Sequence, residues 1–257
     1  MKIFAISLPR FKERYEHLQK HLSTFSGLNF SFIGVDGSNE IITSRRSTST
    51  FLPGAIGCTL SHIEAYKCIE AENLHCALII EDDAVLPKNI IQILAKISIK
   101  IKSNEIISLY SRTIGTAKYS SRHAERLESA RLLYPMEAKW VRSTAAYVIG
   151  RDAAINIARG NDPIRFLADD FKNFYNEKWI DSIRLMHPMP VTLRAFESTI
   201  EQGQGTGFKN IFRTAVRNIK FFDYFRKIRR QNILNQQEED LIVIDKVSPI
   251  ATGFLGK

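Results

Sequence analysis

The chain has 257 residues, of which 44% are hydrophobic and 25% are charged, and its formal net charge is +9. These values fit a globular protein with one large domain, and no apolar run is long enough to predict a transmembrane helix. The apolar run from Ile3 to Leu8 is too short for a signal peptide and is followed directly by Pro9. The positive charge favours acidic partners such as nucleotide phosphates, anionic lipid or nucleic acid, without choosing among them.

In chain order, strand-like and helix-like segments alternate over the first half of the sequence. Short apolar runs bounded by turns predict strands at 2–7, 30–35, 76–80, 106–110 and 145–149. Apolar residues spaced three and four apart, or a leading Pro or Asp, predict helices at 11–25, 59–71, 88–96 and 152–158. Two polar stretches, 38–51 and 112–135, are expected to form loops or hairpins. This alternation predicts an α/β fold with a mostly parallel sheet covered by helices.

The character of the sequence changes at Phe208. Segment 208–230 carries Lys and Arg at helical spacing beside a stripe of aromatic and aliphatic residues. Such a helix suits a membrane interface, and the alternative is a helix packed on the core with a solvated basic side. We therefore expect a domain at 1–207, followed by a basic helical segment and tail at 208–257.

The three cysteines are Cys58, Cys68 and Cys76. They lack metal-ligand spacing, and their odd number argues against a disulfide framework. We expect small free thiols, mostly buried.

Three adjacent acidic residues, Glu81, Asp82 and Asp83, directly follow the apolar strand at 76–80. In open α/β sheets, ligands bind outside the carboxyl ends of such strands. Adjacent carboxylates there repel one another, and Mg²⁺ or Mn²⁺ removes that penalty. Alternation along an extended segment puts Glu81 and Asp83 on one side, as metal ligands, and Asp82 on the other. The alternative is a solvated acidic turn without function.

Several sequence blocks follow one another in order over residues 2–200. They are 6–10 with Arg14, the run 54–62 ending in Ser61-His62, the acidic run 78–84, and the later segments 143–147, 188–191 and 198–200. Together they resemble glycosyltransferase family 25, the lipooligosaccharide-type transferases that also include collagen galactosyltransferases. Ser7 stands where the family usually has Asn.

The resemblance implies a GT-A-like fold and an inverting transferase. Such an enzyme moves a hexose, galactose or glucose, from a UDP-sugar to a lipooligosaccharide or lipopolysaccharide acceptor. It implies a divalent cation, Mn²⁺ or Mg²⁺, on Glu81 and Asp83. The expected donor-binding residues are Leu8, Arg10, Arg14, Asp36, Gly57, Ser61, His62 and Asp82.

Direct displacement at the sugar needs a base for the acceptor hydroxyl, and Asp169 and Asp170 are the candidates. A solvated helix face is their competing interpretation. His62 and Gly57 also have purely structural alternatives, and Asp36 has one as a turn former beside Gly37. His187 is a weaker candidate for completing the metal shell.

We expect a peripheral position on the cytoplasmic face of the bacterial inner membrane, reached through 208–230. The sequence lacks zinc-finger spacing and RNA-binding blocks, so nucleic acid is not an expected partner. Two other classes stay open. One is a non-catalytic protein that binds anionic lipid or nucleic acid and keeps a vestigial metal site. The other is a metal-dependent phosphohydrolase, which would need further His or Asp ligands.

Overall fold

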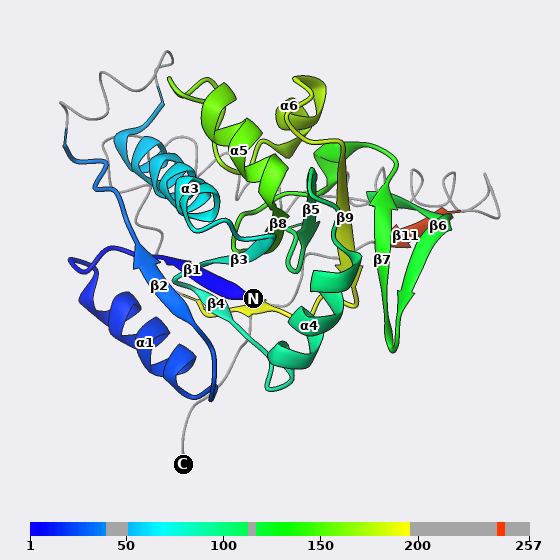
Figure 1. Ribbon diagram of the computed structural model, residues 1–257, viewed down its shortest axis with the longest axis horizontal. Helices are drawn as coiled ribbons and strands as arrows, with labels where there is room; N and C mark the ends of the chain where they lie inside the picture. The colour runs from blue at the N-terminus through cyan, green and yellow to red at the C-terminus, as the bar shows by residue number, and fades with distance from the viewer. Residues whose placement is uncertain (40–50, 113–116, 196–240, 245–257) are drawn as a thin grey trace, which may run out of the picture.

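The computed structural model describes residues 1–39, 51–112, 117–195 and 241–244, the last four as backbone only. A nine-stranded sheet forms its centre, and helices cover both faces (Figure 1). The strands, in spatial order, are β11 (Leu241–Ile244), β6 (Ala117–Leu127), β7 (Ala130–Pro135), β9 (Ser182–His187), β5 (Glu105–Ser108), β8 (Ala146–Gly150), β3 (Cys76–Glu81), β1 (Lys2–Ile6) and β2 (Phe30–Ile33). A separate two-stranded sheet pairs β4 (Ala84–Val85) with β10 (Thr192–Leu193).

Strand direction is uniform over much of the large sheet. Strands β1, β2 and β3 pair in parallel, as do β5 and β9. Strands β8, β7 and β11 run against their neighbours. The predicted α/β fold with a large, mostly parallel sheet is therefore confirmed, and the three reversed strands make the sheet mixed.

The helices divide between the two faces of the sheet (Figure 1). They are α1 (Lys12–Ser23), α3 (Pro53–Ala71), α4 (Ile90–Lys100), α5 (Arg151–Gly160) and α6 (Phe171–Asn176), with a 3₁₀ turn at Ala138–Trp140. One apolar core joins the sheet to α3, α5 and α6, and the other joins it to α1 and α4. Strand β3 contributes Ile79 to the first core and Leu78 and Ile80 to the second. A strand buried on both faces explains the unbroken apolar run before the acidic residues.

Several helix boundaries differ from the expected ones, including the starts of α3 and α5. Helix α3 begins at Pro53 instead of Thr59, because proline is well suited to the first turn and its missing N–H has no helical partner there. Helix α5 begins at Arg151 after Gly150, and Asp152 lies in its first turn without making a side-chain cap. The earlier start of α3 matters, because it brings Cys58 onto the same helix as His62.

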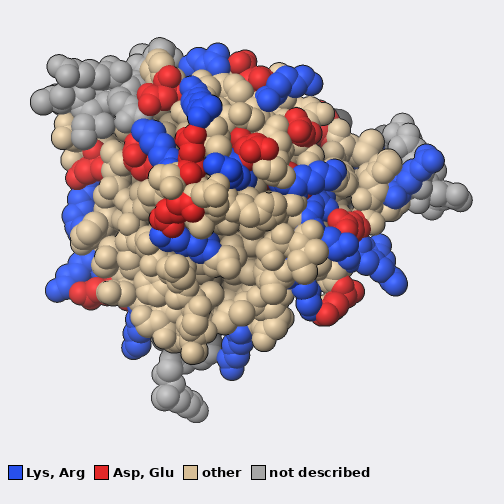
Figure 2. Space-filling model, viewed as in Figure 1, with Lys and Arg blue, Asp and Glu red and all other residues tan. Residues whose placement is uncertain are grey.

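The predicted basic segment 208–230 lies outside the described residues. Within the tail, Leu241–Ile244 pairs with β6 and extends the sheet. No helix in the described part of the chain is both long enough and apolar enough to cross a membrane. On the face in Figure 2, Lys and Arg lie interspersed with Asp and Glu, so no single-sign patch forms on that face.

Candidate functional site

The candidate site lies at the edge of the sheet where β1, β2 and β3 end. Ile6 is the last residue of β1, and it pairs with Glu81 on β3 and with Ile33 on β2. The residues that follow these strands therefore meet at one edge. Strand β8 runs the other way, so Thr144, two residues before its start, joins the same edge.

Asp82 turns toward α1. Its Oδ1 accepts a hydrogen bond of 2.8 Å from Arg14 Nε and a second, shorter one from Arg14 Nη2. Ser7 Oγ lies 3.3 Å from its other oxygen. Asp82 is 8% exposed, so this ion pair is held largely away from water. The structure thus brings together two predicted donor-binding residues, Arg14 and Asp82, and the charge of each compensates the charge of the other.

Glu81 turns to the opposite face, toward α3. Its Oε1 accepts a hydrogen bond from Thr144 Oγ1 and lies 3.4 Å from His62 Nε2. Burial alone would raise the pKa of Glu81, but its interactions with His62 and Thr144 lower that pKa below the ordinary value. Glu81 therefore carries its negative charge at neutral pH. Opposite directions for Glu81 and Asp82 are what alternation along an extended segment predicts.

Asp83 is the least compensated member of the acidic run. Its Oδ1 is buried and accepts no hydrogen bond from the described protein atoms. Burial, followed by the charges of Glu81 and Asp82, raises the pKa of Asp83 to about 7. Its backbone oxygen accepts a 2.8 Å hydrogen bond from Arg194 N, at the start of the β4–β10 pair. A buried carboxylate oxygen without a donor, beside two further carboxylates, fits a hard divalent cation.

Arg10 and Asp36 form a second, more exposed pair at the same edge. Arg10 Nη1 lies 2.8 Å from Asp36 Oδ2, and the two side chains are 46% and 40% exposed. Hydrogen bonds from the backbone and hydroxyl of Ser38 lower the pKa of Asp36. Asp36 therefore stabilises the turn, as its alternative interpretation predicts. Its ionised carboxylate also faces Arg10.

Three predicted donor-binding residues have structural contacts that account for their identity. A Cβ on Gly57 would lie 2.5 Å from Gly37 N, so the glycine permits α3 to approach this loop closely. Ser61 Oγ donates to Gly57 O and accepts from Val35 N, both at 2.8 Å. Leu8 packs near Gly34, where an added Cβ would come within 2.8 Å of Leu8 Cδ2.

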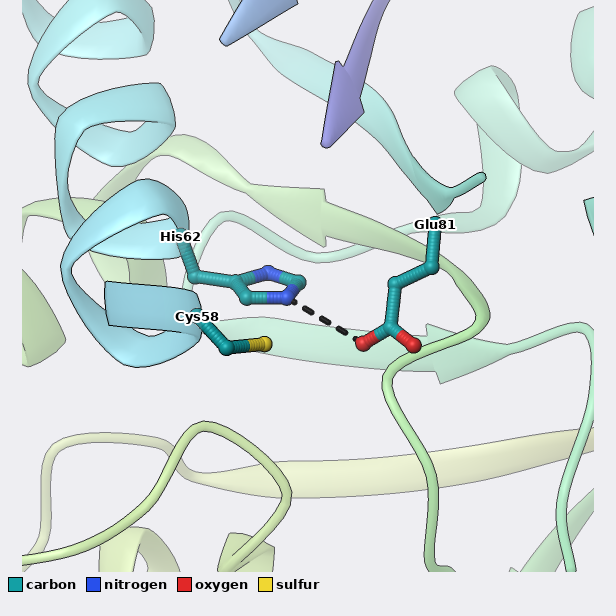
Figure 3. Close-up of side chains that lie close together, drawn as sticks. All are labelled: Cys58, His62 and Glu81. Carbon is teal, nitrogen blue, oxygen red and sulfur yellow. Dashed lines mark ion pairs between the residues drawn. The ribbon is translucent and has the colours of Figure 1, made fainter. Parts of the chain in front are cut away.

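His62 lies under the acidic edge and is only 1% exposed. Its Nδ1 is 2.8 Å from Tyr147 Oη, which in turn is 2.5 Å from Tyr66 Oη. Its Nε2 is buried, makes no hydrogen bond with the described protein atoms, and faces Glu81 and Cys58 (Figure 3). Cys58, His62 and Glu81 each offer one possible metal-ligand atom, and these three atoms lie within 4.8 Å of one another, a separation suited to a metal ion.

The two candidate bases occupy different surroundings. Thr59 Oγ1, on α3, accepts a 3.2 Å hydrogen bond from Ala168 N and anchors the turn that carries Asp169. Partial removal from water, followed by the charge of Glu81, raises the pKa of Asp169, although the residue remains exposed. Asp170 starts α6, and its Oδ2 accepts a 2.7 Å hydrogen bond from Asn173 Nδ2. The charge of Glu81 thus acts on Asp169, whereas the side chain of Asp170 is engaged locally by Asn173.

Some residues of this region were not among the sequence candidates. Cys58, Thr144 and Tyr147 all contact or adjoin Glu81 and His62. The available signal for Cys58 was its spacing of four residues from His62, which places both on one helix face. The expected helix start at Thr59 hid that signal. His187 lies at the end of β9, which β5 and β8 separate from β3.

A large hollow of the described surface lies elsewhere. It has a volume of about 890 Å³ and is lined by residues that include Lys100, Tyr134 and Arg184, and it contains none of the predicted site residues. We therefore locate the candidate site by its charge and hydrogen bonding and not by cavity size.

The fold and the site together define an α/β protein with a carboxylate-rich ligand site outside the carboxyl ends of its parallel strands. Residues 1–172 match the sequence model of glycosyltransferase family 25, described as an LPS biosynthesis protein. This match covers more than half of the chain, and the protein belongs to that family. It is accordingly a glycosyltransferase of lipopolysaccharide biosynthesis. No curated protein matches the chain.

Proposed function

We propose that this protein is an inverting, metal-dependent transferase that moves galactose or glucose from a UDP-sugar to a lipooligosaccharide or lipopolysaccharide acceptor. The observation that carries this proposal is the acidic run at the end of β3. Two of its carboxylates have protein partners, whereas the buried Oδ1 of Asp83 accepts no hydrogen bond from the described atoms. Such an arrangement suits an enzyme that handles a cation together with an anionic diphosphate.

Glu81 and Asp83 are the residues that would hold Mn²⁺ or Mg²⁺. Mutual repulsion with Glu81 and Asp82 contributes to the raised pKa of Asp83, and a cation is the natural compensation for that repulsion. When bound, the cation would stabilise the negative charge that develops on the departing nucleoside diphosphate.

Arg10 and Asp36 would contact the donor from the segments after β1 and β2, and Arg14 would contact it from α1. Arg10 is half-exposed, so its guanidinium can exchange Asp36 for a phosphate oxygen at low cost. Arg14 is held against Asp82 and would act from a fixed position. Asp82 would direct its remaining acceptor capacity to the donor ribose.

Asp169 is the proposed base for the acceptor hydroxyl. The charge of Glu81 contributes to the raised pKa of Asp169, which supports this role because a raised pKa makes the carboxylate a stronger proton acceptor. Asp170 is used locally at the start of α6 and would not share this role.

Replacing Asp169 by Asn tests this assignment, with Asp170→Asn as the matched control. Transfer from a panel of UDP-hexoses to a lipooligosaccharide acceptor would be measured together with donor affinity. We expect Asp169→Asn to lower kcat by about 10²–10⁴-fold, the contribution typical of a general base, with donor affinity nearly unchanged. Asp170→Asn should remain within a few-fold of the parent. Near-normal turnover in both folded variants would show that neither Asp169 nor Asp170 is the base.

We also propose that the enzyme works on the cytoplasmic face of the inner membrane, attached through segment 208–230. The support is the sequence pattern of that segment, in which cationic residues flank an aromatic and aliphatic stripe. This location would place the active site beside a lipid-linked acceptor.

A further inference from the structure

A mixed set of metal-ligand side chains lies between α3 and the end of β3. Cys58 and His62 project from successive turns of α3, and Glu81 reaches toward them from β3 (Figure 3). Their ligand atoms lie within 4.8 Å of one another. A tetrahedral Zn²⁺ ion, with bonds of about 2.0–2.3 Å, needs ligands about 3.5 Å apart, so small side-chain movements would complete the site.

The hydrogen bonding of His62 leaves one ring nitrogen available. Nδ1 lies 2.8 Å from Tyr147 Oη, whereas Nε2 is buried, lies 3.4 Å from Glu81 Oε1, and makes no hydrogen bond with the described part of the chain. When a metal ion binds, Nδ1–H would donate to Tyr147 Oη, and the Nε2 lone pair would face Cys58 and Glu81. A hydrogen-bond partner on one imidazole nitrogen, with the other nitrogen left for the ion, is typical of metal-binding histidines.

Glu81 is also held in place by a residue outside the group. Thr144 Oγ1, from the segment before β8, donates a hydrogen bond to Glu81 Oε1. Tyr66 supports His62 indirectly, because its hydroxyl forms a hydrogen bond with the Tyr147 hydroxyl that contacts His62. Glu81 and His62 therefore have the outer hydrogen bonds that orient metal ligands.

We propose that Cys58, His62 and Glu81 bind one Zn²⁺ ion, with a fourth position left for solvent or another ligand. One thiolate, one imidazole and one carboxylate suit Zn²⁺, whereas Mg²⁺ and Mn²⁺ prefer oxygen ligands alone. Coordination requires Cys58 as the thiolate, so its proton leaves to solvent when the ion binds. The ion would clamp α3 to β3 and fix the direction of Glu81.

This site shares Glu81 with the proposed donor cation but does not depend on glycosyl transfer. Asp83 and Asp169 take no part in it, and Cys58 and His62 take no part in the hard-cation site. The two proposals can therefore fail separately.

Cobalt substitution tests the site directly. The full-length protein would be freed of metal and titrated with Co²⁺, which reports a thiolate ligand by a sulfur-to-cobalt charge-transfer band. We expect one equivalent of Co²⁺ with this band, displaced by one equivalent of Zn²⁺. Cys58→Ser should abolish the band, and Cys68→Ser, a change on the same helix outside the group, should preserve it.

A second variant keeps the proposal testable if Cys58→Ser fails to fold. The chain has three cysteines, so the double variant Cys68→Ser/Cys76→Ala leaves Cys58 alone and must still give the band. Tyr147→Phe should weaken Zn²⁺ binding by about 10–100-fold, the usual effect of losing an outer partner.

Absence of the charge-transfer band from the parent protein at one equivalent of Co²⁺, or its persistence in folded Cys58→Ser, overturns the proposal. Asp83→Asn separates the two sites, since it should retain the band and lose cation-dependent donor binding. A retained band without any hexose transfer would contradict only the proposed function.

Discussion

The three carboxylates of the acidic run differ in how their negative charge is compensated. Glu81 relies on Thr144 and His62, and Asp82 relies on Arg14. Asp83 has a buried oxygen that accepts no hydrogen bond from the residues that the structure describes, and its pKa is raised to about 7. Neighbours in sequence thus differ in role because alternate side chains face different layers of the fold. The uncompensated member is the one best suited to an added cation.

The Arg14–Asp82 pair gives a prediction at this scale. Arg14→Met leaves Asp82 buried without its cation, which should lower the free energy of unfolding by about 3–5 kcal/mol. Arg10→Met removes an exposed partner of Asp36 and should cost no more than about 1 kcal/mol. Urea unfolding of both variants measures the difference. Equal stability of the two would show that burial does not distinguish these ion pairs.

Among the secondary-structure elements, α3 organises the site. It carries Cys58 and His62 toward Glu81, and Thr59 anchors the turn before Asp169. Its first turns lie close to the loop after β2, where an added Cβ on Gly57 would come within 2.5 Å of Gly37 N and 2.8 Å of Val35 O. These are backbone atoms, so relief requires movement of the helix or of the loop.

Gly57→Ala therefore tests the position of α3. In an ordinary helix interior this change would stabilise the protein by about 1 kcal/mol. Here we expect a net loss of about 1–3 kcal/mol from overpacking, together with weaker donor binding. Thermal unfolding and donor titration measure both effects. A variant as stable as the parent, with normal donor affinity, would contradict the close approach.

For the whole molecule, sequence reasoning succeeded where burial follows a simple pattern. The apolar run of β3 and the spacing in α1 predicted their elements, because each buries a regular face. Strand β9 was missed, since Arg184 interrupts its apolar run. In the fold, Arg184 Nε and Nη2 donate to the buried Glu105 at 2.8 and 2.6 Å, a contact between residues 79 apart. Such long-range compensation has no local signal.

The same limit applies to the candidate site. The acidic run and Arg14 were identified from local blocks, and the fold brings them together. The approach of Cys58 to Glu81 depends on how α3 crosses the end of β3, which spacing alone does not specify. The preference for Asp169 over Asp170 likewise required the position of Glu81.

Membrane attachment is a prediction for the whole chain. Replacing Lys209, Arg213, Arg217 and Lys220 by Gln should lower co-sedimentation with anionic liposomes at least tenfold, because each basic residue near such a surface contributes about 1 kcal/mol. The matched control replaces four lysines elsewhere, Lys12, Lys20, Lys88 and Lys178, all exposed. An equal loss in both variants would assign the binding to net charge and not to this segment.

The most direct test of the account is calorimetric titration of UDP-galactose and UDP-glucose into the full-length protein, with and without Mn²⁺. The parent should bind at least one of these donors with Mn²⁺, and affinity should fall at least tenfold without the ion or in Asp83→Asn. Asp152→Asn, on α5, serves as the control and should bind as the parent does. Donor affinity that is indifferent to both Mn²⁺ and Asp83, or binding of neither donor, would contradict the central claim.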